Sequence, residues 1–179
     1  MGENPWKRAE TLFAEKIRPP RIFDSRQRRT VPQTDLFGTA PPRDTSLEGR
    51  ARARYCAEHG LACVPLCLES YARPWQRASL DGIDLGQSRA LEIKCGPATY
   101  AEVAASRRVP AHYVGQLQQT LAVTGFDAID FWVWRPGLVP LKLTVPRNEA
   151  YIATLIERGA EFWDRVSAAR GQMSWASRP

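Results

Sequence analysis

The sequence predicts an α/β fold in a single domain spanning residues 1–179, on three observations. Apolar side chains recur at helical spacing near both ends of the chain, which indicates amphipathic helices. The middle holds short apolar or alternating segments between turn residues, which indicates strands. With 179 residues, 44% of them hydrophobic and 25% charged, the chain is large enough to bury one core without disulfide bonds.

The first expected element is a short amphipathic helix that starts at Asn4-Pro5 and stops at Pro19-Pro20. Residues 19–44 carry Pro, Arg, Gln and Thr with little periodicity, so we expect a long basic loop that is partly disordered. Three arginines in this loop are Arg26, Arg28 and Arg29.

The positive charge is concentrated in the first third of the chain. Residues 1–54 contain 12 Lys and Arg against 7 Asp and Glu, which gives +5 of the net +6. A basic segment suits a polyanion such as nucleic acid, because Lys and Arg neutralise phosphates. A solubilising surface explains the same charge equally well.

The remaining elements follow from turn and helix-end signals. A helix is expected from Thr45 to Gly60, whose missing side chain suits a helix C-terminus. Strands are expected at 62–69, 77–80, 83–85 and 90–94, with Asp81-Gly82 as a turn. A polar helical stretch beyond Pro97, a helix ending at Gly125, strands at 127–134 and 138–145 and a helix at 148–169 complete the pattern.

Two acids and a lysine meet in the middle of the chain. On a strand, Glu92 and Lys94 point to the same face, and a turn at Asp81 brings a second carboxylate beside them. Asp81, Glu92 and the backbone carbonyl of Ile93 make a credible magnesium site, because this cation prefers oxygen ligands. Lys94 would then hold the attacking water or a phosphate. The alternative is an ordinary charged strand edge beside an Asp-Gly turn.

Three sequence motifs resemble the YqaJ-like viral recombinase family, the lambda exonuclease family of PD-(D/E)xK nucleases. They are Leu80-Asp81-Gly82, Leu91-Glu92-Ile93-Lys94-Cys95 and the run from Tyr113 to Gln118 with Val123-Thr124-Gly125 after it. The resemblance covers roughly residues 5–170. It implies a PD-(D/E)xK restriction-endonuclease-like core with a mixed central sheet flanked by helices.

The resemblance also implies an activity. Family members are Mg²⁺-dependent deoxyribonucleases, with Mn²⁺ able to substitute, that digest linear double-stranded DNA from 5′ ends and leave 3′ single strands for recombination. A homotrimer and a single-strand annealing protein would be the partners. An endonuclease or resolvase-like nuclease at the same site, or a catalytically idle DNA-binding protein with this fold, are the alternatives.

The family pattern adds two residues to the expected site. Glu48 matches a glutamate that completes the metal site, so the expected metal ligands are Glu48, Asp81, Glu92 and Ile93. Thr45-Ser46-Leu47-Glu48 is also a capping-box pattern, in which Glu48 would only stabilise a helix start. Gln116 matches a glutamine of the family's active site.

The sequence departs from the family pattern at three points. Leu80 and Gly96 replace prolines, which leaves the charges in place. In lambda exonuclease relatives, an arginine before the first matched helix grips the 5′-terminal phosphate, and this sequence begins too late for that segment. Arg26, Arg28 and Arg29 are therefore the expected DNA-binding residues.

Other polar and aromatic residues are expected to be structural. We assign Asp84, Asp127 and Asp130 to the scaffold, and Phe131, Trp132, Trp134 and Trp163 to the core rather than to base stacking. The four cysteines, Cys56, Cys63, Cys67 and Cys95, lack CxxC spacing and a histidine cluster, so no zinc or iron-sulfur site is expected. Without a secretion signal or a long apolar run, we expect a protein of a bacterial host's cytoplasm, with no membrane partner.

Overall fold

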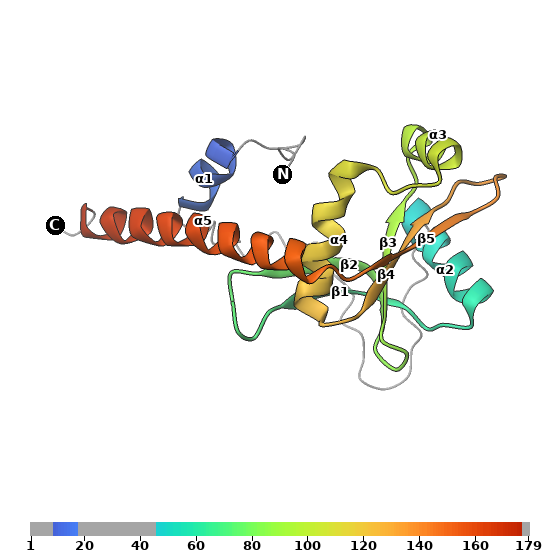
Figure 1. Cartoon of the computed structure of the whole chain (residues 1–179), viewed down its shortest axis with the longest axis horizontal. Coiled ribbons are helices and arrows are strands. Elements are labelled where there is room, and N and C mark those ends of the chain that lie inside the picture. Colours follow the sequence, from blue (N-terminus) through green and yellow to red (C-terminus); the bar gives the residue numbers. More distant parts are fainter. Residues whose placement is uncertain (1–8, 18–45, 177–179) are drawn as a thin grey trace, which may run out of the picture.

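The computed structural model describes residues 9–17 and 46–176 (Figure 1). Along this part of the chain, two helices are followed by three strands, two helices, two strands and a last helix. Their bounds are α1 Ala9–Ile17, α2 Leu47–His59, β1 Val64–Glu69, β2 Arg77–Asp84, β3 Arg89–Lys94, α3 Pro97–Ser106, α4 Ala111–Thr124, β4 Ala128–Val133, β5 Leu141–Pro146 and α5 Glu149–Ala176.

In the described residues the strands form one five-stranded sheet in the order β1-β2-β3-β4-β5. Three pairings are antiparallel, between β1 and β2, β2 and β3, and β4 and β5. β3 and β4 are parallel. Parallel neighbours require a crossover connection, which α3 and α4 provide. The expected mixed sheet flanked by helices is therefore confirmed.

Two hydrophobic clusters hold the helices to the sheet. Leu117 and Leu121 of α4 pack with Phe131 in one cluster. Tyr55 of α2 packs with Trp132 in the other. β4 is buried along nearly its whole length, because helices cover both of its faces. Phe131 and Trp132 are thus core residues, as expected.

The expected turn at Asp81-Gly82 is wrong, because β2 runs through both residues without a break. Leu66 of β1 pairs with Leu80, whereas Val64 pairs with Ile83. Two residues of β1 therefore span three residues of β2, which is a β-bulge in β2. Asp-Gly favours a turn locally, but pairing with β1 keeps the chain extended and a bulge absorbs the extra residue.

Two of the expected features lie outside the described residues. The basic loop at 19–44, with its three arginines, is one of them. The helix start at Asn4-Pro5 is the other. Within the described ranges, no helix is long and apolar enough to cross a membrane.

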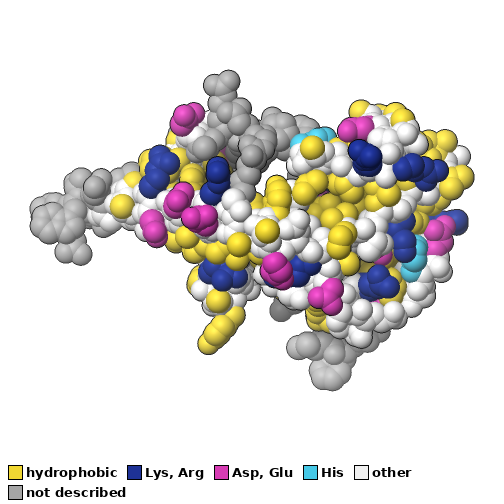
Figure 2. All heavy atoms as spheres, viewed as in Figure 1, with side chains coloured by type: hydrophobic (Ala, Val, Ile, Leu, Met, Phe, Trp, Pro, Cys, Tyr) yellow, Lys and Arg dark blue, Asp and Glu magenta, His cyan; other side chains and the backbone are white. Residues whose placement is uncertain are grey.

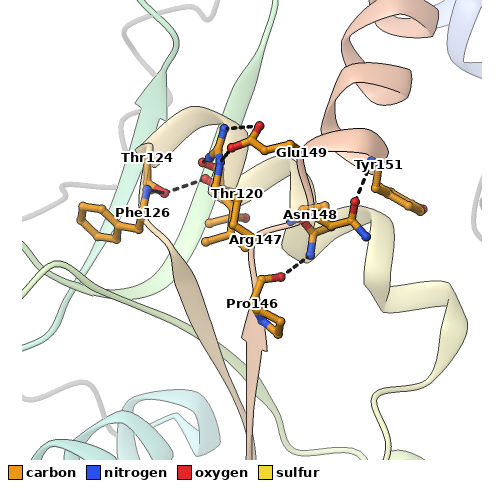
Figure 3. A network of polar contacts seen from close by, with 10 residues as sticks. Thr120, Thr124, Phe126, Pro146, Arg147, Asn148, Glu149 and Tyr151 are labelled. Atoms are coloured by element: carbon orange, nitrogen blue, oxygen red, sulfur yellow. Dashed lines mark hydrogen bonds and ion pairs between the residues drawn. The ribbon is translucent and has the colours of Figure 1, made fainter.

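The start of α5 is fixed by polar contacts to α4 and β5 (Figure 3). Gln118 of α4 donates to the Pro146 carbonyl and accepts from the Asn148 N–H, both at 2.9 Å. The Asn148 side chain accepts from the Tyr151 N–H at 2.9 Å. From this junction α5 extends away from the sheet and carries α1 on its far half (Figure 1), where Phe13 and Phe162 pack edge to face. The helix runs past its expected end at residue 169.

Candidate active site

The β2 bulge places the Asp81 side chain where it can accept a hydrogen bond from β3 in place of a backbone carbonyl of β2. The β2–β3 pairing stops at Gly82 and Leu91, so the Ile93 N–H has no backbone partner in β2. The Asp81 carboxylate accepts this N–H at 2.7 Å instead. Bulges commonly redirect a side chain next to an active site. Asp81 is thereby fixed against the strand that carries Glu92 and Lys94.

Glu92 is the buried acid of the site, with 2% of its surface exposed. Its Oε1 accepts from Lys94 Nζ at 2.5 Å and from Gln116 Nε2 at 2.7 Å. Burial and the charge of Asp81 raise the pKa of Glu92 to about 7, although Lys94 and Gln116 act in the opposite direction. Burial lowers the pKa of Lys94, but the Glu92 carboxylate outweighs it, so the net shift is upward. The lysine therefore stays protonated.

Glu48 joins the same acidic group and does not form the capping box that was the alternative interpretation of its sequence pattern. The helix N-cap is Ser46, whose hydroxyl accepts the Gly49 N–H at 3.0 Å. Glu48 then falls one position short of the capping-box glutamate, and its carboxyl group hydrogen-bonds the Asp81 side chain. Burial, this hydrogen bond and the charge of Asp81 raise the pKa of Glu48.

Sequence reasoning missed two side chains that contact the site residues. Arg52 Nε donates to the Asp81 carbonyl. Arg52 follows Glu48 by four residues, which places both side chains on one face of α2, and this spacing could have identified Arg52 from the sequence. The Tyr113 ring lies under Lys94 Nζ at 4.9 Å from its centroid. Tyr113 begins the Tyr113–Gln118 motif of the family resemblance, but the sequence alone assigned it no role.

Two of the three acids expected to be structural, Asp84 and Asp130, make contacts within the scaffold. Asp84 accepts the N–H groups of Ala62 and Gln87 at 2.9 and 3.1 Å, which fixes the β2–β3 turn. Asp130 is 2% exposed and accepts from Tyr55 and Thr144 hydroxyls, each at 2.5 Å. It lies on the α2 side of the sheet.

The donor groups at Asp81 and Glu92 suit a hard divalent cation. Among residues 9–17 and 46–176, no three Asp, Glu, His or Cys side chains gather closely enough to hold a metal by themselves. The expected ligand set adds the Ile93 carbonyl to the carboxylates of Glu48, Asp81 and Glu92, and in these described residues the three carboxylates do not gather closely enough to hold a metal without it. The N–H and C=O of one strand residue face the same edge, so that carbonyl points toward Asp81. Burial first, and Asp81 second, raise the pKa values of Glu48 and Glu92, and a bound cation would favour the charged form of both carboxylates.

Cys95, just beyond β3, lies within the fields of several charged residues. Burial raises the pKa of its thiol, and the charges of Glu48 and Asp81 raise it further. The charges of Arg135 and Lys94 lower it. Arg135, which follows β4, is thus close to the edge of the sheet that holds the acids.

Comparisons with known proteins agree with this architecture. An alkaline exonuclease from Laribacter hongkongensis superposes with a TM-score of 0.67 and 26% identity, over 73% of this chain and 70% of that one. The same enzyme in complex with dAMP gives a TM-score of 0.68 and 26% identity, over 80% and 76%. These matches confirm the expected fold class.

Among curated proteins, none matches the sequence significantly. The YqaJ-like viral recombinase domain matches residues 1–127, which is more than half of the chain. The chain therefore belongs to the YqaJ-like viral recombinase domain family.

Proposed function

We propose that the protein is a Mg²⁺-dependent deoxyribonuclease that digests linear duplex DNA from 5′ ends. The observation that carries the proposal is the contact of Lys94 with a buried Glu92 beside Asp81. Family membership and the similarity to alkaline exonuclease structures support a nuclease. The direction of digestion and the choice of metal are the finer parts of the proposal.

Asp81, Glu92 and the Ile93 carbonyl would hold the cation, with Glu48 as a further ligand. A bound Mg²⁺, or Mn²⁺ in its place, lowers the pKa of water and stabilises negative charge on a phosphate. Both hydrogen bonds to Glu92 go to Oε1, which leaves Oε2 for a cation.

Lys94 and Gln116 have separate roles in this proposal. The protonated Lys94 ammonium holds the attacking water or a phosphate oxygen, because it carries donors only. Its position over the Tyr113 ring limits where those donors can point. Gln116 holds the Glu92 carboxylate in one orientation.

The choice between exonuclease and endonuclease is tested with DNA topology. Purified protein is incubated with linear and covalently closed duplex, with Mg²⁺ or with EDTA, and the linear duplex carries either a 5′ or a 3′ label. We expect loss of the linear DNA in Mg²⁺ only, early release of the 5′ label and intact circles. Rapid nicking of circles would instead establish an endonuclease or resolvase-like activity, and no cleavage in any arm would favour the idle DNA-binding alternative.

End recognition and assembly are further parts of this proposal. Arg26, Arg28 and Arg29 are proposed to hold the 5′ phosphate, since the planar guanidinium fork matches paired phosphate oxygens. Replacing all three with alanine should erase a preference for 5′-phosphorylated over 5′-hydroxyl ends in the same assay. The single domain, the homotrimer and the annealing partner stay predictions.

A further inference from the structure

We infer that Arg50 and Arg135 form a phosphate-binding site on the α2 side of the acidic centre, which consists of Glu48, Asp81 and Glu92. There the two arginines hold the backbone of the bound DNA strand. The inference rests on the proposed nuclease function for the identity of the ligand. Neither arginine was among the residues expected from the sequence.

Arg50 is held in place by the aromatic ring of Trp134, a residue whose backbone is hydrogen-bonded to β3. Its Cζ lies 5.5 Å from the centroid of the Trp134 ring. Trp134 is 9% exposed, and its backbone N–H donates to the Lys94 carbonyl at 3.0 Å. A guanidinium over an aromatic face keeps its in-plane N–H donors available for a second partner. The exposed Arg50 side chain is therefore positioned and still able to bind.

Arg135 lies at the same edge of the sheet as the acids. β3 and β4 run parallel, with Lys94 opposite Val133, so their carboxyl ends meet at one edge. Arg135 follows β4 by two residues, and its charge acts on the Cys95 thiol together with those of Glu48 and Asp81. The two arginines thus border the acidic centre from α2 and from the end of β4.

Both guanidinium groups lack an acidic partner within the described ranges, whereas several other arginines there have one. Arg54 pairs with Glu58, and Arg77 pairs with Glu69. Basic side chains also gather over the end of the molecule that carries α2 and α3 (Figure 2). Because these two guanidinium groups lie beside the acidic centre but pair with none of its carboxylates, they suit a ligand that carries several negative charges at a distance from one another. A DNA backbone supplies one phosphate to each arginine while a third reaches the metal ligands.

The test measures DNA binding without cleavage. A fluorescein-labelled, 5′-phosphorylated duplex oligonucleotide is titrated in EDTA by fluorescence anisotropy, at several salt concentrations. We expect Arg50→Ala and Arg135→Ala each to weaken binding about tenfold. Each should also lower the slope of log K against log salt by roughly one. Arg54→Ala is the matched control, since it removes an arginine of the same helix that is already paired with an acid, and should change neither quantity.

Arg50→Lys separates binding from folding, because it keeps a cation over Trp134 but loses the planar fork. It should retain the thermal stability of the wild type and most of its salt slope, with weaker affinity. Unchanged affinity and slope in Arg135→Ala and Arg50→Lys would overturn the inference, even if Arg50→Ala fails to fold. Wild-type protein that binds through both arginines but cleaves no DNA in Mg²⁺ would sink the proposed function and leave this site standing.

Discussion

At the scale of single residues, the buried Glu92 makes the metal-free protein sensitive to pH. Its pKa is about 7 in the folded protein, against an ordinary value of 4.5. The folded state therefore binds more protons than the unfolded chain between these values, and the free energy of unfolding falls as pH rises through this range. The pKa shift of Glu92 corresponds to a decrease of about 3 kcal/mol in the free energy of unfolding between pH 4 and pH 8.

Urea unfolding in EDTA at pH 5 and pH 8 checks this prediction, with Glu92→Gln beside the wild type. The variant carries no titrating group at this position, so its stability should change less between the two pH values. An equal change in both proteins would show that Glu92 does not control the pH response.

Glu48→Gln distinguishes a metal ligand from a helix-capping residue. Glutamine keeps a hydrogen bond to Asp81 but removes the negative charge that a cation needs. We expect normal thermal stability in EDTA, a smaller rise of Tm on adding Mg²⁺, and reduced cleavage. Ser46→Ala is the matched control, because it removes the actual cap hydroxyl at a cost of about 1 kcal/mol and leaves the acids intact. Its Mg²⁺-induced rise in Tm should equal that of the wild type.

At the scale of elements, the β2 bulge depends on the small size of Gly82. A Cβ there would lie 3.1 Å from Cys63 Cβ and 3.1 Å from Leu91 Cδ2. Gly82→Ala should therefore destabilise the protein by about 1–3 kcal/mol and displace the neighbouring Asp81. The rate of DNA cleavage should consequently fall by more than the loss of folded protein explains. Gly86→Ala is the control in the next turn, where a Cβ would meet only Asp84 Oδ1 at 3.4 Å. Equal cleavage by the two variants would contradict the proposed role of the bulge.

The order of helices and strands was predictable, but the conformation at Asp81-Gly82 was not. Apolar periodicity and end signals placed most element ends within a few residues, as with Gly125 after α4. The bulge depends on pairing with β1, a contact that local sequence does not record. The grouping of Glu48 and Gln116 with Glu92 came from the family resemblance, since no spacing rule links α2, β3 and α4. Arg50 and Arg135 were missed because Trp134 and the parallel strand ends bring them together only in three dimensions.

At the scale of the whole molecule, α5 is joined to the sheet domain by close packing at Gly159. A Cβ at this position would lie 2.6 Å from Trp75 Cζ3 and 2.7 Å from Cη2, in the loop between β1 and β2. Gly159→Ala should lower Tm despite the gain of about 1 kcal/mol in helix propensity. In a Trp75→Ala background the clash is absent, so the same change should raise Tm. A lower Tm in both the wild-type and the Trp75→Ala background would contradict the packing explanation.

The single parallel pairing of the described sheet also sets the order in which the site is completed during synthesis. Glu48, Asp81, Glu92 and Lys94 all precede the crossover formed by α3 and α4, and Gln116 lies within it. The acids therefore leave the ribosome first. Gln116, whose amide binds Glu92, follows them, and β4, which pairs with β3, follows last. A chain stopped inside the crossover holds every carboxylate of the centre and lacks the strand that aligns them. The strand pairing that aligns the centre can therefore form only when the nascent chain has passed β4.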